Sequence, residues 1–563
     1  MTTRAVSVLT EVAALDRPFT YVTTVGTEFV GAGDRVRVSL NGRSVRGWVL
    51  GDTEPVEDML ALTKSLGYGP PGELLDLAGW MSDRWCAPLA RVLVSLTPTG
   101  VVAKLPVAPT ATAPPVTPRH RWEPGPIHLG ATTDPLDLVL AAYQQVWSRP
   151  GSLLVLVPTE AWARRLRGRL AQRGLAVAGA EQWAEMRAGW PVIVSARGGA
   201  LAPTPRLCGA VIIDADDENY VSSMFPNWDA LTVVRERCRR DGANLWATSM
   251  APSPSLLALG PLERDPEFAD AWPSLMVIDR RVRDPHEGVL APSALDAAHI
   301  ALSGKEPVGV VVVLQRLGTG RLLACARCGE LARCAVCNQA EGEVNGAIVC
   351  SEAHEVREPF CRSCGATKLK RVRSGVTTLA RDVAAQLGRP VSEVTRAASP
   401  GELERVVVGT EAVFSRVRRC ALVIYSDFDQ YLLAPHASAR RAAIAAVGRA
   451  GRLVGSRREH RGEVILQTRR GDDLVADALE RLDFARVMEL DVTDARTLGL
   501  APFAASAEVS GEDAGLVVEG LSGPGMSVSV TETGFVVRGP DPLSLGRLLK
   551  ERARSRRVRV AIR

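Results

Sequence analysis

Long apolar runs are missing from this 563-residue chain. The longest ones, LLVLV at 153–157 and VGVVVVL at 308–314, have the length of a strand and fall far short of the ~20 residues that cross a bilayer. The first residues also lack a charged start followed by an apolar run and a small-residue cleavage site. We therefore expect a cytoplasmic protein without a membrane role.

A strong charge bias is missing as well. The net charge of +5 comes from 68 basic and 63 acidic residues, and it is too small to demand a polyanionic partner. Hydrophobic residues make up 46% of the chain, which excludes general disorder. This length predicts roughly three to five domains. Basic residues gather at 440–461 and 547–563, where they form either phosphate-contacting surfaces or ordinary solvated faces.

The organisation of the chain follows from its hydrophobic patterns. The strands AVSVL, FTYVTTV, DRVRVSL and VRGWVLG, separated by GAGD and NG turns, predict a β-rich front module. An apolar-periodic stretch at 74–96 predicts a helix, and the Pro-rich passage at 105–126 predicts a linker. Apolar runs at 153–158, 192–196, 210–218, 406–410 and 421–427 alternate with arginine-rich helical stretches.

Such alternation predicts two parallel α/β lobes in a multidomain α/β protein. The predicted units are a front module at 1–104, a linker at 105–126, a first lobe at 127–290, the start of a second lobe at 291–324, a cysteine-rich region at 325–372, the rest of the second lobe at 373–461, and a C-terminal α+β domain at 462–563.

Cysteine is scarce outside one short segment. Seven of the eleven cysteines fall within forty residues: Cys325, Cys328, Cys334, Cys337, Cys350, Cys361 and Cys364. With His354 they make eight potential ligands, and paired C-x-x-C motifs of this kind fill two closed, structural zinc sites. A disulfide framework and an iron–sulfur cluster are the alternatives, and a cytosolic setting and the spacing disfavour them. The four remaining cysteines have apolar neighbours and are expected in the core.

This combination resembles the PriA family of bacterial primosomal replication-restart helicases over nearly the whole chain. The resemblance is carried by LQRLGTGRLLACARCGELARCAVC (314–337), VVVGT, AVGRAGR, GEVILQT (462–468) and the FTYV…GDRVRV…GWVLG series. It implies one zinc ion on Cys325, Cys328, Cys361 and Cys364, and a second on Cys334, Cys337, Cys350 and His354. The family has a cysteine two residues after the counterpart of Cys350, whereas this chain reads C-S-E-A-H.

The family also implies an ATP-driven motor, and here the sequence departs from it. The segment LGATTDPLD (129–137) lies at the phosphate-loop position, where Gly130 and Thr132 fit the family pattern. Leu136 replaces the lysine that reaches phosphate, and Asp137 replaces the hydroxyl residue that holds magnesium. The carboxylates of Asp134 and Asp137 repel a triphosphate and so disfavour the use of ATP and magnesium, and we expect ATP-driven unwinding to be lost.

The second half of the motor site is also altered. Asp214 keeps the position of a magnesium ligand, but Ala215 replaces the catalytic glutamate, and the whole stretch also fits an acidic turn that closes a strand. The motif at 448–452 keeps Arg449 and Arg452, which reach the γ-phosphate in active relatives. In this chain they are expected to bind DNA phosphate or to hold the lobes together.

Two DNA-binding features of the family are changed. Its winged-helix domain has no counterpart other than the Pro-rich passage, and its F-D-Y signature for a 3′ end reads Phe19-Thr20-Tyr21. Tyr21 is a candidate for stacking on a base, with Arg35, Arg37 and Arg43 near phosphates, although an aromatic residue on a short strand also fits a core position.

The sequence therefore predicts a monomeric, nucleoid-associated replication-restart protein without helicase activity of its own. It would bind forked or single-stranded DNA, primosome proteins and the replicative helicase, and its two zinc ions would be structural. An active 3′–5′ DNA helicase is the first alternative. A zinc-organised protein–protein adaptor without DNA binding is the second.

Overall fold

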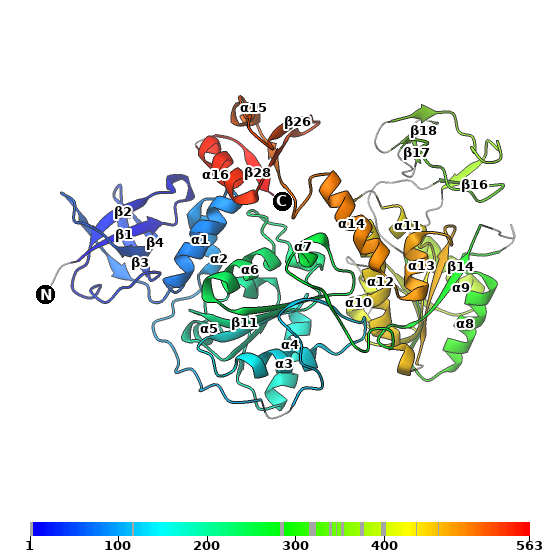
Figure 1. Ribbon diagram of the computed structural model, residues 1–563, viewed down its shortest axis with the longest axis horizontal. Coiled ribbons are helices and arrows are strands. Elements are labelled where there is room, and N and C mark those ends of the chain that lie inside the picture. Colours follow the sequence, from blue (N-terminus) through cyan, green and yellow to red (C-terminus); the bar gives the residue numbers. More distant parts are fainter. Residues whose placement is uncertain are drawn as a thin grey trace.

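The computed structural model describes residues 4–114, 117–281, 287–314, 323–336, 341–344, 346–350, 354–371, 376–395, 401–434, 436–459, 461–554 and 556–562. Figure 1 shows a β-rich front module, two α/β lobes, a small cysteine-rich segment above the second lobe, and a C-terminal domain above the helices of the front module and the first lobe. Within the described residues, no helix has both the length and the apolar character that crossing a bilayer requires.

The front module is built on one sheet with the strand order β5-β2-β1-β4-β3-β6. All its pairings are antiparallel except that of β2 with β5. The strands are β1 (Ala5–Thr10), β2 (Pro18–Val22), β3 (Arg35–Leu40), β4 (Arg43–Asp52), β5 (Leu60–Ala61) and β6 (Lys64–Ser65). Val6, Val8, Val36 and Val38 alternate along their strands and form its core, which confirms the predicted β-rich module.

The single helix predicted over 74–96 is two helices, α1 (Glu73–Arg84) and α2 (Leu89–Leu96). The break has two local causes. Cys86 has φ of 50°, outside the helical region, and Pro88 disfavours a helical residue before it. The apolar period continues across the break, so the sequence pattern alone did not reveal it.

The Pro-rich passage is attached to the first lobe at Thr112 and Trp122. Between α2 and Gly125, the described residues form no helix and only an isolated bridge at Val102. The carbonyl of Thr112 accepts a hydrogen bond from the Tyr143 hydroxyl at 3.0 Å. The carbonyl of Trp122, whose ring is buried, accepts bonds from Gln145 and Trp246 at 2.9 and 3.0 Å. The passage is therefore part of the surface of the lobe rather than a free tether.

The first lobe is a parallel sheet with the strand order β13-β7-β12-β11-β8-β10-β9. Its strands are β7 (Gly125–His128), β8 (Ser152–Leu156), β9 (Val177–Ala178), β10 (Val192–Ser195), β11 (Leu207–Ile212), β12 (Asn244–Ser249) and β13 (Glu263–Arg264). Its helices are α3 (Pro135–Val146), α4 (Glu160–Gln172), α5 (Trp183–Ala188), α6 (Ala230–Asp241) and α7 (Pro254–Leu257). Every residue of β8, β10 and β11 is buried, as expected for strands covered on both faces.

The second lobe is a six-stranded parallel sheet with the order β14-β24-β23-β15-β22-β21. Its strands are β14 (Ser274–Asp279), β15 (Val308–Val313), β21 (Val391–Val394), β22 (Val406–Gly409), β23 (Cys420–Tyr425) and β24 (Glu463–Thr468). Its helices are α8 (Pro292–Ser303), α9 (Val376–Leu387), α10 (Val413–Arg416), α11 (Asp429–Leu432), α12 (Ala439–Val454), α13 (Leu474–Arg481) and α14 (Ala485–Thr497).

Two of the predicted boundaries need correction. β14 falls within the predicted first lobe at 127–290, but it pairs with β24 of the second sheet. β24 falls within the predicted C-terminal domain at 462–563, yet it lies between β14 and β23. Leu479 and Phe484, which follow β24, are buried in the same core as Val423. An apolar run identifies a strand but not the sheet that it joins, which explains both errors.

The C-terminal domain is an antiparallel sheet with the order β26-β27-β25-β28 and two helices. Its elements are β25 (Ala505–Ser510), α15 (Ala514–Val518), β26 (Ser527–Thr531), β27 (Gly534–Gly539), α16 (Pro542–Ala553) and β28 (Arg559–Ile562). Helix α16 packs on α1 of the front module: Lys550 Nζ lies 3.2 Å from Asp83 Oδ1, and Cys86 is buried in the core of the C-terminal domain. The first and last domains are therefore joined (Figure 1).

The contact of α16 with α1 depends on Gly546. A Cβ added there would lie 2.1 Å from the carbonyl oxygen of Asp83, which belongs to the backbone of α1. We expect Gly546→Ala to destabilise the protein by about 1–3 kcal/mol, because one helix must move away from the other. Urea unfolding of the full chain measures this effect.

Gly515 in α15 is the matched control, because a Cβ there meets nothing within 4 Å. Gly515→Ala should leave stability unchanged or raise it by ~0.5–1 kcal/mol through its higher helix propensity. Equal unfolding midpoints for the two variants would contradict the tight contact.

Candidate functional site

Two C-x-x-C pairs meet beside strands β16 and β20 of the cysteine-rich segment. The antiparallel pairing of β16 (Leu323–Cys325) with β20 (Leu369–Arg371) brings Cys325 and Cys328 to Cys361 and Cys364. The Sγ atoms of Cys325 and Cys364 are 3.6 Å apart, and so are those of Cys328 and Cys361. Four thiolates around a tetrahedral zinc ion at ≈ 2.3 Å would be about 3.8 Å apart, so the donor set fits zinc.

Backbone groups support the charge of Cys325 in this cluster, whereas burial and neighbouring thiols raise the pKa of Cys328 to about 12. Burial opposes the thiolate form of Cys325, but N–H groups of Cys328 and Arg327 and neighbouring thiols lower its pKa to about 7. The Arg327 N–H donates to Cys325 Sγ at 3.3 Å. Because the thiolate is the form that binds a metal ion, these donors favour a closed metal centre.

A second group of donors lies beside the sheet of β17 (Glu341–Val344), β18 (Ala347–Cys350) and β19 (Val356–Arg357), and Cys350 is the last residue of β18. The ligand atoms of Cys334, Cys350 and His354 lie within 4.8 Å of one another, with Cys350 Sγ 3.9 Å from His354 Nδ1. Cys337, the predicted fourth ligand, lies outside the described residues. The described donors of each cluster could together hold one metal ion, as the cysteine spacing predicted.

The other cysteines are core residues. Cys86, Cys208, Cys238 and Cys420 are buried, and burial raises the pKa of Cys420 and of Cys238 to about 12. Neutral thiols of this kind are neither metal ligands nor nucleophiles at neutral pH.

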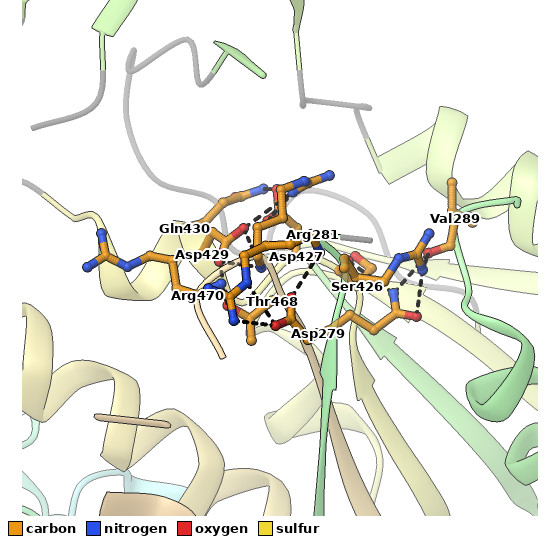
Figure 2. Close-up of polar contacts among 12 residues, drawn as sticks. Asp279, Arg281, Val289, Ser426, Asp427, Asp429, Gln430, Thr468 and Arg470 are labelled. Carbon is orange, nitrogen blue, oxygen red and sulfur yellow. Dashed lines mark hydrogen bonds and ion pairs between the residues drawn. The ribbon is translucent and has the colours of Figure 1, made fainter. Parts of the chain in front are cut away.

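A polar network forms the carboxyl edge of the second sheet, beneath the cysteine-rich segment (Figure 2). The Asp429 carboxylate is fully buried and accepts hydrogen bonds from the Thr468 hydroxyl and from the Arg469 N–H at 3.0 Å. Nearby, Leu433 of the lobe packs with Ala324 and Leu331 of the cysteine-rich segment. The segment therefore rests on an edge that is fixed by its own hydrogen bonds.

The loop at the predicted phosphate position, between β7 and α3, is filled by protein groups. The Gly130 N–H donates to Asp265 Oδ2 at 3.2 Å, and the Thr133 hydroxyl also donates to this carboxylate. Thr132 donates its N–H and its hydroxyl to the Ala271 carbonyl at 2.9 and 2.8 Å. The donors that would cradle a phosphate are therefore used within the chain.

A carboxylate caps the helix that follows this loop. Asp134 is the N-cap of α3, accepts a hydrogen bond from the Leu136 N–H at 3.1 Å, and pairs with Arg169 of α4, whose Nη1 lies 2.9 Å from Oδ1. Burial opposes its charge, but these hydrogen bonds lower the pKa of Asp134. The positive end of the α3 dipole, which favours anions, therefore already has one.

The second acidic stretch binds the other lobe. Asp214, which follows β11, is buried and receives Arg452 of α12 in a bidentate pair, with Nη1–Oδ2 at 2.6 Å and Nη2–Oδ1 at 2.9 Å. Asp216 accepts from the Ser253 N–H at 2.9 Å, and Asp217 caps a short turn through the Asn219 N–H. Each carboxylate of this stretch therefore has a partner within the chain.

Arg449, the other arginine of the predicted motif, stays within its own lobe. Its Nη2 lies 3.0 and 3.1 Å from the two carboxylate oxygens of Glu411, and the Tyr431 hydroxyl donates to the same carboxylate at 2.8 Å. Neither arginine of the motif is free to reach a nucleotide in this arrangement.

The candidate DNA residues of the front module separate into two groups. Tyr21 is buried and donates its hydroxyl to the Ser39 carbonyl at 2.9 Å, and Arg35 is buried and donates to the Gly100 carbonyl at 2.9 Å. For Tyr21, burial favours the core position over stacking on a base. For Arg35, burial corrects the expectation of a phosphate contact, because the side chain is enclosed by the module. Arg37 and Arg43 are exposed, so their DNA contact stays a prediction.

Sequence reasoning missed a cavity of about 520 Å³ at the carboxyl edge of the first sheet. It lies between the front module and the loop at 218–228, and its lining includes Ser95, Glu160, Arg197, Phe225 and Trp228. Arg197 donates to the Val221 carbonyl at 2.7 Å and lies 6.0 Å from the Trp228 ring centre. The aromatic residues of the polar stretch SSMFPNW (222–228) were the available sequence signal.

One comparison with known proteins identifies the front module. Residues 7–98 match the family model of the PriA 3′ DNA-binding domain (3′BD), a span that covers the sheet and both helices of the module. This match supports DNA binding as its role. A search of curated proteins found no match.

Two solved structures show distant similarity to this chain. A DEAD box protein from the hyperthermophile Methanococcus jannaschii is 12% identical, with a TM-score of 0.30 over 65% of this chain and 87% of that chain. Dbp5 of S. cerevisiae, bound to RNA and ADP BeF3, is 12% identical, with a TM-score of 0.34 over 67% of this chain and 85% of its own. At this level of similarity, the fold of the two lobes is defined by their own strand order and not by the comparison.

The cysteine clusters predict a metal content that can be counted. We expect two zinc ions per chain by elemental analysis, and one in Cys361→Ser, because the variant breaks one four-thiolate site and leaves the other intact. Iron instead of zinc, or a variant that retains both ions, would contradict the assignment.

His354→Ala tests the second cluster in the same way and should also lower the count to one. Cys420→Ala removes a thiol from β23 and is the control, so it should retain both ions. A count of two in His354→Ala would remove His354 from the ligand set.

Proposed function

We propose that this protein is a replication-restart scaffold that binds branched or stalled DNA forks and helps to load the replicative helicase. The observation that carries the proposal is the 3′ DNA-binding domain match at residues 7–98, joined to two parallel α/β lobes and a cysteine-rich segment. The partners are forked or single-stranded DNA, primosome proteins and the replicative helicase. The protein acts as a monomer in the cytoplasm, at the nucleoid.

Two zinc ions hold the cysteine-rich segment in shape in this proposal. Each would be closed by four protein ligands, so the ions supply structure and no reaction. The segment rests on the second lobe through Leu433 and could present its outer face to partner proteins. Val336 and Val356 are 73% and 68% exposed there, which supports a contact surface on this face.

The DNA surface begins at the front module. Arg37 and Arg43 are exposed there, and the cavity beside Phe225 and Trp228 offers aromatic faces for a base from an unpaired strand. Of the two basic runs, the one at 440–461 is largely used in internal ion pairs that include Arg440 with Asp491 and Arg452 with Asp214. The run at 547–563 keeps several exposed arginines: Arg554, Arg556 and Arg559.

The proposal also holds that ATP is not used. Asp134 occupies the anion position of α3, the loop donors are bonded to Asp265 and Ala271, and Ala215 cannot orient water. Without nucleotide turnover, fork binding must be driven by contacts alone. Specificity then comes from the shape of the junction and from its phosphates.

Fork binding should depend on salt in proportion to the phosphates that are contacted. We expect the double variant Arg37→Ala/Arg43→Ala to lower the slope of log K against log salt by about 1–2, since each phosphate contact contributes ≈ 0.7–0.9. Phe225→Ala should weaken binding about tenfold only for forks with an unpaired strand. Fluorescence anisotropy at several salt concentrations measures both.

Arg381→Ala is the control for the arginine pair, because Arg381 is exposed on α9 of the second lobe, outside the proposed surface. Salt-insensitive or absent binding of the unaltered protein would instead favour the zinc-organised adaptor.

ATP provides the test against the helicase alternative. We expect no fork-stimulated phosphate release and no retention of labelled ATP in equilibrium dialysis with magnesium, because carboxylates occupy the phosphate positions. Turnover that is abolished by Arg449→Ala would establish an active motor and refute this part of the proposal.

A further inference from the structure

The two lobes meet along a seam with one continuous core. Ala131, Met250 and Trp272 of the first half are buried in the same cluster as Val447 and Phe484 of the second lobe. Helix α12 approaches closely at two glycines: a Cβ on Gly448 would lie 2.4 Å from Met250 Sδ, and one on Gly451 would lie 2.9 Å from Pro273 Cδ. Helix α12 and the first half are therefore closely packed at these points.

Arg452 lies at the centre of this seam. Besides its bidentate pair with Asp214, it donates Nε–H to the Ala131 carbonyl at 3.0 Å and lies 4.9 Å from the Trp162 ring centre. All three partners belong to the first lobe, while Arg452 belongs to α12 of the second. The pair is largely enclosed, with 28% of the Arg452 side chain and 7% of that of Asp214 exposed.

We propose that Arg452 is an internal latch: its guanidinium, bound to the Asp214 carboxylate, holds the two lobes closed as one unit without any nucleotide. A cation at a domain seam needs an anion on the opposite face, and here the chain itself supplies one. Because the anion is covalently part of the protein, no ligand has to bind before the lobes close. The latch is independent of whether the protein binds DNA, so it goes beyond the proposed function.

Neighbouring contacts favour the same closed state. Arg264 donates to the Leu482 carbonyl at 3.1 Å, and the Arg457 N–H donates to the Trp272 carbonyl at 2.6 Å, both across the seam. The rings of Trp272 and Phe484 have centres 5.2 Å apart. Removing Arg452 would leave the Asp214 carboxylate without its cation at a buried position, and an uncompensated buried charge strongly disfavours closure.

Hydrogen–deuterium exchange of the full chain tests the latch. In the unaltered protein, the amides of β11 and of β23 should be protected from exchange to the same degree, because the two lobes open as one unit. Addition of Mg·ATP should not change this protection. In Arg452→Ala, exchange should rise at least about 30-fold at the seam, at 128–134 and 444–454.

Arg458→Ala is the matched control. Arg458 pairs with Glu267 across the lobes at 3.3 Å, but both side chains are about two-thirds exposed. The rise in exchange should therefore stay below about fivefold.

Three results would overturn the proposal. They are equal exchange in the two arginine variants, independent opening of the two sheets in the unaltered protein, and increased protection of the seam on addition of Mg·ATP. If Arg452→Ala does not fold, Arg452→Lys keeps the charge but loses the bidentate geometry, and it should show an intermediate rise at the seam. Loss of fork binding with unchanged seam protection would count against the proposed function and leave the latch intact.

Discussion

The burial of apolar surface where the two lobes meet is the constraint on which the rest of the structure depends. Parallel strands need cover on both faces, and α12 covers β23 of its own sheet in the same core that holds Met250 and Trp272 of the first half. Every other unit is attached to this body: the Pro-rich passage lies along the first lobe, and the cysteine-rich segment rests on the second. The sites keep their positions because the seam keeps its shape.

Local patterns were readable from the sequence, and long-range partners were not. The buried strands follow from apolar runs such as 153–157, and the metal clusters follow from cysteine spacing, because in both cases the signal lies within a few residues. The partner of Arg452 is 238 residues away, and no local pattern names it. Placing β24 in the second sheet required the same kind of long-range information. Tyr21 fits both a core and a binding position by its alternation, so only its burial decides between them.

Many of the arginines stabilise the fold instead of forming a surface for phosphate. Many of the guanidinium groups that a sequence reader assigns to phosphate are bonded to carbonyls and carboxylates within the chain, as Arg35 and Arg449 are. A near balance of 68 basic and 63 acidic residues permits this internal pairing. Arginine is suited to it because its fork matches a carboxylate in two places. Charge runs in arginine-rich sequences therefore overstate the surface that is available to nucleic acid.

The docking of α16 on α1 affects how the protein is made on the ribosome. The face of α1 around Cys86 is covered by a helix that is synthesised roughly 450 residues later. At typical elongation rates of ≈ 5–20 residues per second, that face waits for its cover for roughly 20–90 s. During this interval Cys86 and the Asp83 end of α1 lack their contacts with α16, so the nascent front module is completed only after the C-terminal domain has been made.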